Sequence, residues 1–402
     1  MVKVPVRSIV AAIARAAGRW SDPTFLPRVH ARESVSARTG YSLATVEYAF
    51  DRLFGNVRAE AIEAVIADEL GCLEILDDFV GRRGRPRARA LPIGRVCIIS
   101  SRTTIGVAIV PAIFAICAKC DVFVKDREDY LVAAFLQTLT EELPELAGRA
   151  LAQPWVGGAG AVNLRPFDTI VAFGSDATLA EISAQVCFPS RLIGFGSKAS
   201  AGYIASAALR DEREACAIAA LAARDLVLYE SEGCLSLHAL FLENPSNVSA
   251  ARFAEILIDA MRAAALTFPP ALDDPATASR RAIARELATF RGNVTIAQAD
   301  TRGDYLAVVD PPFDEPPLFL PRTTAVRSVD SPAAAARYLE HHNIELESIA
   351  VTSSSAAVFE LAARTKAARI TAFGTLQAPA LGDHSGGRPR IAEFVRWLVD
   401  ES

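Results

Sequence analysis

Residues 95–125, RVCIISSRTTIGVAIVPAIFAICAKCDVFVK, decide the fold. Two short apolar runs, at residues 95–100 and 121–125, flank a longer apolar stretch at residues 103–118. Short unbroken apolar runs are typical of strands that are buried on both faces, as in a parallel sheet covered by helices. The stretch therefore predicts a strand, a helix and a second strand of an α/β domain.

The same alternation continues to the end of the chain. Further strands are predicted at residues 169–173, 191–195, 236–243, 305–310, 324–329, 348–353 and 370–373. Further helices are predicted at residues 130–143, 177–186, 211–223, 250–265, 278–290, 331–341 and 391–399. Two α/β domains that meet near residue 205 are the simplest division.

The first 90 residues are predicted to be helical. One helix is expected at residues 57–70, with Asn56 as its cap and Gly71 as its end. The arginine-rich segment at residues 82–89 contains Gly84 and Pro86, which break regular structure, and predicts an exposed connector. A subunit contact or an anion site is the alternative for this segment.

The composition indicates a globular protein. Of the 402 residues, 51% are hydrophobic and 22% are charged, which allows a sizeable core and two or three domains. The net charge of −5 offers no bulk attraction to nucleic acid or to an anionic membrane. The longest apolar stretch, at residues 103–118, is interrupted by Pro111 and is short for a bilayer span. We therefore expect neither a nucleic-acid partner nor a membrane span.

The cysteines predict a reducing, cytoplasmic location. Their number is odd, and the chain starts without a secretory signal. Cys117 and Cys120 form a C-x-x-C, but at the end of an apolar helix and not at a helix N-terminus, which argues against a redox pair. No second such pair indicates zinc, and no metal is expected. The seven cysteines are Cys72, Cys97, Cys117, Cys120, Cys187, Cys216 and Cys234.

Cys234 is the cysteine best placed for chemistry. It follows a short polar stretch and immediately precedes a strong strand. A thiolate at such a junction is accessible, and its own backbone N–H can stabilise an oxyanion. A buried structural cysteine is the alternative. His238, four residues further on, is expected to be a packed strand residue.

Glycine-containing turns predict a ligand site. Gly174 and Ser175 stand directly between a strand and a helix, where free backbone N–H groups suit a pyrophosphate. An ordinary turn with a helix cap is the alternative. Gly194 and Gly196 follow the next strand. Two such turns at adjacent strand ends favour a ligand between them.

A lysine and a glutamate follow the strand at residues 121–125. Lys125 and Glu128 could hydrogen-bond ribose hydroxyls or a 2′-phosphate. Taken alone, they would be surface charges. The glycines at residues 157–161 lack the strand and helix that a dinucleotide fingerprint requires, so this segment is predicted to be a loop.

Taken in order, these segments resemble the aldehyde dehydrogenase superfamily and, within it, the acyl-CoA reductases of the LuxC type. The helical start of the chain resembles the N-terminal part of that family through RAEAIEAVIADELGCLEILDDF. The other matching stretches are IISSRTTIGVAIVPAIFAICAKCDVFVKDRE, FDTIVAFGSDATLAEI, RLIGFGSKASAGYI, EGCLSLHALFLE and GTLQAPALGDHSGGRPRIAEFVRWL.

The resemblance implies an aldehyde dehydrogenase-like α/β fold. Residues 1–205 would hold the helical N-terminal part and a Rossmann-type NAD(P)-binding domain. Residues 206–385 would form a second α/β domain that carries the nucleophile. Residues 386–402 would return to the cofactor domain or to a subunit interface, and a homo-oligomer, either a dimer or a tetramer, is implied.

The resemblance also assigns roles to site residues. Cys234 would take up the acyl group. Gly174 and Ser175 would approach the cofactor pyrophosphate, and Lys125 with Glu128 would contact the adenosine ribose.

Two features depart from the superfamily pattern. The turn at residues 194–198 lacks the glutamate with which hydrolytic members activate water, which favours transfer to or from a thiol. The oxyanion asparagine of the first strand-helix turn is also missing, and Arg102 or Thr103 stands near its place.

The expected reaction is reduction of an acyl-CoA or acyl-carrier-protein thioester to the aldehyde through an acyl group on Cys234. CoA would be the leaving group and NADPH the reductant. NADH is the alternative, because Glu128 near the ribose would repel a 2′-phosphate. Two more functions stay open at this point: an oxidative aldehyde dehydrogenase, and a catalytically impaired member that serves as a subunit of an assembly.

Overall fold

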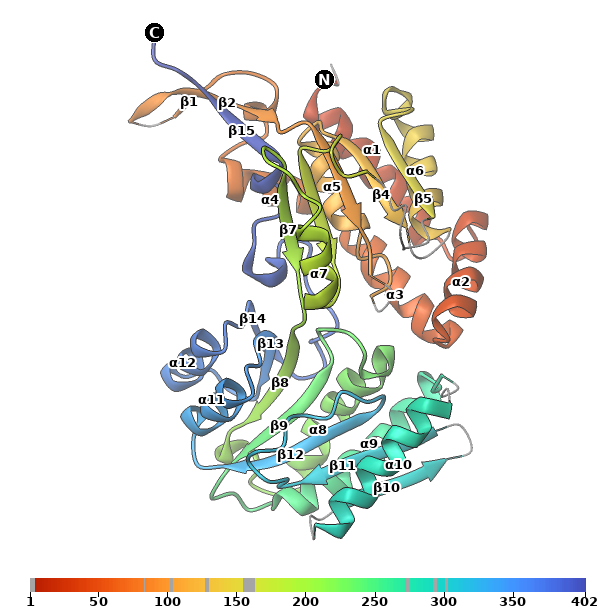
Figure 1. Ribbon diagram of the computed structural model, residues 1–402, viewed down its shortest axis with the longest axis vertical. Helices are drawn as coiled ribbons and strands as arrows, with labels where there is room; N and C mark the ends of the chain where they lie inside the picture. The colour runs from red at the N-terminus through yellow and green to blue at the C-terminus, as the bar shows by residue number, and fades with distance from the viewer. Residues whose placement is uncertain are drawn as a thin grey trace. The chain divides into compact units, whose positions relative to one another are not determined.

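The computed structural model shows two compact units, which we call unit 1 and unit 2. Unit 1 comprises Met1–Thr39, Val46–Ser197 and Ala380–Ser402, and unit 2 comprises Gly40–Thr45 and Lys198–Pro379. Each has a mainly parallel sheet with helices, which confirms the predicted α/β class (Figure 1). The structure describes residues 4–82, 84–101, 104–126, 130–154, 163–271, 275–291, 295–300 and 303–402.

A parallel sheet in the order β5-β4-β3-β6-β7 forms the centre of unit 1. The order of the strands reverses between β3 and β6, and ligands of such sheets bind at the carboxyl ends of the strands at this point. Ser100 follows β3 there, and Gly174 with Ser175 follows β6. The strands are β3 (Arg95–Ile99), β4 (Asp121–Asp126), β5 (Ala150–Pro154), β6 (Thr169–Phe173) and β7 (Arg191–Phe195).

The prediction that the first 90 residues are helical is confirmed up to Leu70, whereas the strands β1 (Val80–Arg82) and β2 (Arg85–Pro92) follow. An aromatic cluster packs the N-terminal helices against α6: the Trp20 ring lies 5.0 Å from that of Phe54 and 6.3 Å from that of Phe135, and Trp20 Nε1 donates to Thr138 Oγ1 at 3.0 Å. The helices of this unit are α1 (Val6–Ser21), α2 (Leu26–Thr39), α3 (Leu43–Asn56), α4 (Ala59–Leu70), α5 (Ile109–Cys117), α6 (Leu131–Glu142) and α7 (Asp176–Ser183).

The start predicted for the fourth helix is wrong, whereas its end is confirmed. Arg58, not Asn56, is the N-cap of α4. Gly71 ends the helix with a φ of 99°, a conformation that glycine adopts without steric cost.

A small antiparallel sheet corrects two predictions. The segment expected to be an exposed connector forms β1 (Val80–Arg82) and β2 (Arg85–Pro92). The segment expected to be the last helix contains β15 (Val395–Asp400), which pairs with β2 over its whole length. Backbone pairing between chain segments about 300 residues apart overrides the local helical pattern. In Figure 1 the C-terminal strand accordingly runs beside β2.

The sheet of unit 2 has the order β10-β11-β12-β9-β8-β13-β14. The pair β10-β11 is antiparallel and all the other pairs are parallel. The strands β5, β8 and β10 were not predicted from the sequence. The strands of this sheet are β8 (Ala199–Ile204), β9 (Leu237–Glu243), β10 (Thr295–Asp300), β11 (Gly303–Val309), β12 (Thr323–Val329), β13 (Leu346–Val351) and β14 (Arg369–Ala372).

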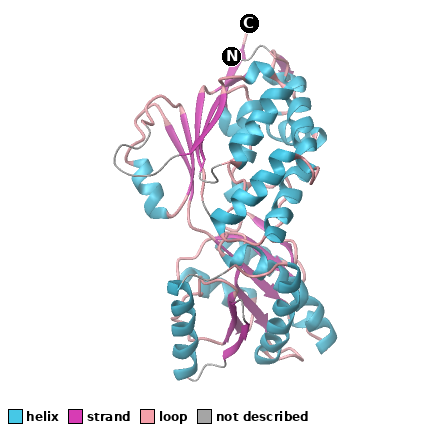
Figure 2. Ribbon diagram, turned by 90° about the vertical axis from the view of Figure 1, so that its right-hand side faces the viewer, coloured by secondary structure: helices cyan, strands magenta, loops and turns pink. Residues whose placement is uncertain are grey.

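Helices cover both faces of this sheet. Apolar side chains of α8 (Glu212–Val227) and α9 (Ala250–Thr267) pack on one face. Those of α11 (Pro332–His341) and α12 (Ala356–Arg364) pack on the other, and α12 was not predicted. The strands therefore lie between helices (Figure 2), and α10 (Pro275–Phe290) lies beside β10 and β11.

Across the described residues, we find no helix that combines the length and the apolarity needed to cross a bilayer.

We expect Gly202→Ala to destabilise the protein. Gly202 lies in β8, and a Cβ atom there would come 2.6 Å from Phe373 and 2.7 Å from Leu240. Such overpacking costs about 1–3 kcal/mol. The measurement is the midpoint of urea unfolding. Gly18→Ala is the matched control, because Gly18 is exposed on α1 with no atom within 4 Å of an added Cβ, and alanine favours the helix. Equal midpoints for the two variants would contradict the close packing at Gly202.

Candidate functional site

Cys234 stands in a tight turn directly before β9, as the sequence predicts. The Ser236 N–H closes the turn by donating to the Gly233 carbonyl at 2.9 Å. The Ser200 hydroxyl, from the start of β8, donates to the Cys234 carbonyl at 2.8 Å. The Cys234 side chain is half-buried, and the backbone N–H groups of Cys234 and Leu235 favour its ionised sulfur. The turn therefore fixes the position of the sulfur and provides donors for negative charge.

His238 is an extra residue in the pairing of β8 with β9. The register shifts by one residue between Ser200 and Ala201, which leaves His238 without a counterpart. Its side chain is 4% exposed, and its ring lies 4.7 Å from that of Phe319. Burial lowers the pKa of His238 to about 4, although a hydrogen bond to the Gly233 carbonyl opposes this shift. His238 is thus a packed, neutral strand residue at pH 7, as predicted.

Glu347 is an extra residue in the pairing of β8 with β13. The register shifts between Leu346 and Ser348, and such bulges re-aim side chains and are frequent next to active sites. The Glu347 carboxylate lies 3.8 Å from the Lys198 ammonium group, and the two side chains are 13% and 18% exposed. Glu347 could not be identified from the sequence, because a bulge leaves no mark in the residue pattern.

The charges of this pair act on the thiol in opposite directions. Burial and the Glu347 carboxylate raise the pKa of Cys234 to about 12, whereas Lys198 lowers it. The resting thiol is therefore protonated at neutral pH.

The segment before the turn has an unusual backbone. Tyr229, Glu230 and Ser231 have φ angles of 55°, 53° and 57°, the left-handed region that non-glycine residues rarely adopt. Each such residue costs on the order of 1 kcal/mol, so the surrounding structure must hold the segment in place.

A buried ion pair holds this segment. Arg322, at the start of β12, donates two hydrogen bonds of 2.8 Å to the Glu230 carboxylate, and the two side chains are 2% and 8% exposed. Arg322 also donates to the Phe268 carbonyl at 2.8 Å, and the Ala271 N–H donates to Glu230 at 3.2 Å. The fork of the guanidinium matches the carboxylate, so both charges are satisfied.

The N-terminal part of the chain adds a further support. Gly40–Thr45 belongs to unit 2, and within it the buried Tyr41 hydroxyl donates to Glu232 at 3.1 Å. The Tyr41 ring lies 6.0 Å from that of Tyr229. Burial and the nearby glutamates raise the pKa of Tyr41. No pattern in the sequence indicated this contact.

A buried aspartate, Asp225, is linked to the turn through its backbone carbonyl. Asp225, in α8, accepts a hydrogen bond of 2.7 Å from the Gly374 N–H. The Gln377 side chain donates to the Asp225 carbonyl at 3.3 Å and to the Ser236 hydroxyl at 3.0 Å. Burial raises the pKa of Asp225 to about 7, and backbone donors oppose the shift. A single aspartate in the apolar stretch LAARDLVLY is a signal that could have found this residue.

In unit 1, the two glycine turns pack against each other. Ser175 is the N-cap of α7 and accepts from the Thr178 N–H at 3.2 Å, so this turn has the ordinary helix cap that the sequence also allowed. The Asp176 carboxylate accepts from the Ser197 N–H at 2.8 Å, and a Cβ at Gly196 would come 2.4 Å from that carboxylate. Gly196 is therefore required for the contact between the turns.

Gly174 and Gly194 also pack closely. An added Cβ would come 3.3 Å from Thr178 at Gly174, and 3.1 Å from Leu179 at Gly194. Contact of these turns with a cofactor stays a prediction.

The other predicted cofactor residues are only partly described. Lys125 is buried at the end of β4, and its carbonyl accepts from the Ser100 N–H at 3.2 Å and from the Ser100 hydroxyl at 3.0 Å. Glu128, Arg102 and Thr103 lie outside the described residues, as do the glycines of residues 157–161.

Three other cysteines, Cys97, Cys117 and Cys120, are buried. Burial raises the pKa of Cys97 to about 12 and that of Cys120 to about 11, and it also raises the pKa of Cys117. Cys117 ends α5 and Cys120 precedes β4, as predicted. Within the described residues, no three His, Cys, Asp or Glu side chains gather as a metal site would require.

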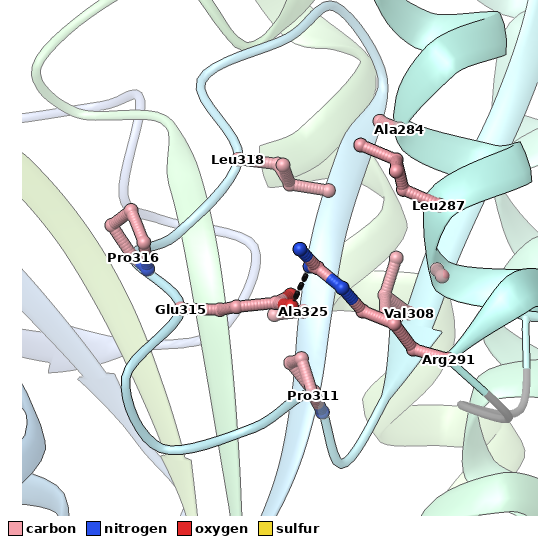
Figure 3. A pocket seen from close by; sticks show the side chains of 10 residues that line it. Ala284, Leu287, Arg291, Val308, Pro311, Glu315, Pro316, Leu318 and Ala325 are labelled. Atoms are coloured by element: carbon pink, nitrogen blue, oxygen red, sulfur yellow. Dashed lines mark hydrogen bonds and ion pairs between the residues drawn. The ribbon is translucent and has the colours of Figure 1, made fainter.

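Unit 2 also has an apolar pocket beside α10 (Figure 3). Arg291 and Glu315 form an ion pair in it, and Leu287, Val308 and Leu318 contribute apolar walls. None of the predicted site residues lines this pocket.

We expect Arg322→Met to destabilise the protein by about 3–5 kcal/mol, because it leaves the Glu230 carboxylate buried without its partner. The measurement is urea unfolding. Adding Glu230→Gln should recover part of the loss. Arg364→Met removes the exposed ion pair with Glu340 and should cost at most about 1 kcal/mol. Equal losses for Arg322→Met and Arg364→Met would rule out a structural role for the buried pair.

We expect Asp225→Asn to gain stability relative to the wild type as the pH rises. The pKa of Asp225 is higher in the folded state, about 7, than the ordinary 3.8, so ionisation destabilises the wild type between these values. Between pH 5 and pH 8, the free energy of unfolding of the variant should rise by about 2–3 kcal/mol relative to that of the wild type. Urea unfolding at the two pH values measures it, and parallel changes in both proteins would contradict the shifted pKa.

Comparison with solved structures shows the fold. The TM-score is 0.72 with aldehyde dehydrogenase 21 from Physcomitrella patens in complex with the reaction product succinate, at 11% identity over 100% of this chain and 86% of that one. It is 0.70 with a NAD-dependent benzaldehyde dehydrogenase from Corynebacterium glutamicum, at 15% identity over 100% and 86%. It is 0.75 with proline utilization A from Bradyrhizobium japonicum, at 15% identity over 99% of this chain and 43% of that one.

Comparison of sequences shows the family. No curated protein matches the chain significantly. The family model for acyl-CoA reductase (LuxC) matches residues 1–397, nearly the whole chain, which confirms the resemblance drawn from the motifs. With the aldehyde dehydrogenase fold and a cysteine turn at the start of β9, the chain belongs to the acyl-CoA reductase (LuxC) family of oxidoreductases.

Proposed function

We propose that this protein reduces a fatty acyl-CoA or acyl-carrier-protein thioester to the aldehyde, with NADPH or NADH as reductant and Cys234 as nucleophile. The observation that carries the proposal is the family match over residues 1–397. The position of Cys234 supports it, because the turn before β9 presents a half-buried thiol with backbone donors on its sulfur.

In the proposed first step, the Cys234 thiolate attacks the carbonyl carbon of the thioester. A bond forms between this carbon and Sγ, the bond to the CoA sulfur breaks, and CoA leaves as a thiolate that takes up a proton. The Cys234 backbone N–H is the proposed donor to the oxyanion of this step. A second donor from residues 102–104 is proposed from the resemblance.

A bound nicotinamide cofactor supplies the hydride that reduces the acyl carbon. The thiohemiacetal on Cys234 then releases the aldehyde when its C–S bond breaks. In sum, the thioester, NAD(P)H and one proton give the aldehyde, NAD(P)⁺ and the free thiol of the carrier.

The strand order of unit 1 fits a dinucleotide. Gly174 and Ser175 lie at the carboxyl end of β6, where the order of the parallel strands reverses. The start of α7 there carries backbone N–H groups suited to a pyrophosphate. Lys125 is the last but one residue of β4, which lies on the other side of β3, and is the residue of the proposed ribose contact. NADPH is the proposed cofactor, with NADH as the alternative because of Glu128.

Thiol transfer is favoured over hydrolysis. The turn at residues 194–198 carries no carboxylate that could activate water. The homo-oligomer stays a prediction of the resemblance.

We expect Cys234→Ala to lower the rate of acyl-CoA-dependent oxidation of NADPH or NADH by on the order of a thousandfold or more. The measurement is the absorbance of the reduced cofactor with acetyl-, octanoyl- and palmitoyl-CoA. In parallel, intact mass should show acylation of the wild type without cofactor and none of Cys234→Ala. Cys187→Ala, which removes an exposed cysteine, is the control.

Different outcomes of these assays would point to a different function. Turnover of an aldehyde with NAD⁺ or NADP⁺, but of no thioester, would indicate an oxidative aldehyde dehydrogenase. If the protein neither reduces a thioester nor oxidises an aldehyde, it would be a catalytically impaired subunit of an assembly.

A further inference from the structure

Two charged side chains flank the backbone contact that holds Cys234. The Ser200 hydroxyl donates to the Cys234 carbonyl at 2.8 Å and accepts from the Ser348 N–H at 3.2 Å. Lys198 stands two residues before Ser200, and Glu347 directly precedes Ser348 in the chain. The hydrogen bonds therefore place the strand starts that carry Lys198 and Glu347 beside the nucleophile turn.

The bulge in β13 explains why a carboxylate lies at this place. Glu347 has no counterpart on β8, since Leu346 pairs with Ala199 and Ser348 with Ser200. Its carboxylate lies 3.8 Å from the Lys198 ammonium group, and both side chains are mostly buried. Charges shielded from water in this way act on a neighbour more strongly than surface charges do.

Other charged and titratable groups lie around the turn, and among them the buried atoms His238 Nδ1 and Asp225 Oδ1 have no hydrogen-bond partner. Arg369, on β14, donates to the Ser348 hydroxyl at 3.2 Å. Glu230 is paired with Arg322, and Glu232 accepts from Tyr41. His238, on β9, reaches the turn through a hydrogen bond to the Gly233 carbonyl. The backbone carbonyl of Asp225, on α8, reaches it through Gln377.

We propose that Lys198 and Glu347 control the ionisation of Cys234, with Lys198 stabilising the thiolate and Glu347 opposing it while holding the ammonium group. This inference rests on the proposed function, in which Cys234 is the nucleophile. Lys198 and Glu347 act through the sulfur and are positioning residues. When the thiol ionises, its proton goes to solvent and its negative charge is balanced by Lys198.

The proposed reaction requires the ionised thiol of Cys234, and Lys198 and Glu347 act on its ionisation. Burial raises the pKa of Cys234 to about 12, so only a small fraction of the thiol is ionised at neutral pH. A single charge that shifts a thiol by one pKa unit changes the thiolate fraction tenfold, and the opposing change in nucleophilicity reduces the effect on rate to roughly threefold.

The test is the rate at which iodoacetamide alkylates Cys234 in the full chain, followed by peptide mass spectrometry from pH 7 to pH 10. In this reaction a bond forms between Sγ and the acetamide carbon, and iodide leaves. At pH 8, Lys198→Met should slow alkylation of Cys234 roughly threefold to tenfold, and Glu347→Gln should speed it by a similar factor. Lys198→Arg should restore the wild-type pH profile, because it keeps the positive charge.

The chain provides matched controls. Glu345→Gln removes a carboxylate two residues from Glu347, in an exposed ion pair with Lys366, and should leave the profile unchanged. The exposed Cys187 and Cys216 serve as internal controls for the reactivity of iodoacetamide in the same samples. The rate at which each of them is alkylated should be equal in all variants.

The proposal is supported if Lys198→Met and Glu347→Gln shift the pH profile of the Cys234 alkylation rate in opposite directions. Profiles that coincide with the wild type, that move in the same direction, or that Lys198→Arg does not restore would overturn it. Alkylation needs neither a thioester nor a cofactor, so a failure here is distinct from a failure of the acyl-CoA assay.

Discussion

The buried ion pair between Arg322 and Glu230 is the interaction on which the turn that carries Cys234 depends. Three residues in the left-handed region precede the turn, and none of them is a glycine. Such a segment is stable only where its surroundings fix it. The bidentate contact anchors the middle residue of the three, Glu230, to the start of β12. The Arg322–Glu230 ion pair thus fixes the segment that directly precedes the Cys234 turn.

The bulges on either side of β8 complete this arrangement. A regular parallel ladder would place each side chain at this level on one face of the sheet or the other. The two register shifts instead free His238 and Glu347 from that alternation, one on each neighbouring strand. Unit 2 thereby places a charge pair, Lys198 and Glu347, near the thiol of Cys234.

Much of the α/β fold could be predicted because its strands are local, unbroken apolar runs. The strands β6 and β7 have the predicted bounds. The segments β2 and β15 were missed because their structure comes from pairing across the chain, which no local window of residues contains. The strand β8 was also missed, because ASAGYI has little of the bulky apolar character that marks a buried strand.

The site could be predicted only in its central residue. Cys234 is visible because a loop-to-strand junction is a local feature, and Ser175 because a cap precedes its helix. Lys198 and Glu347 meet Cys234 only through the register of β8 and β13, which the sequence does not display. Arg322 and Tyr41 come from segments about 90 and 190 residues away from the turn, and a charge or a ring alone does not reveal its partner.

Unit 2 is assembled from two separate segments of the chain, Gly40–Thr45 and Lys198–Pro379. No continuous stretch of the gene encodes the whole of unit 2, because Tyr41 is supplied from near the start of the chain. Exchange of residues 198–379 alone with a relative would separate Glu232 from its hydroxyl donor. On the ribosome, Tyr41 emerges about 190 residues before Glu232, so the hydrogen bond between them can form only after Glu232 has been synthesised.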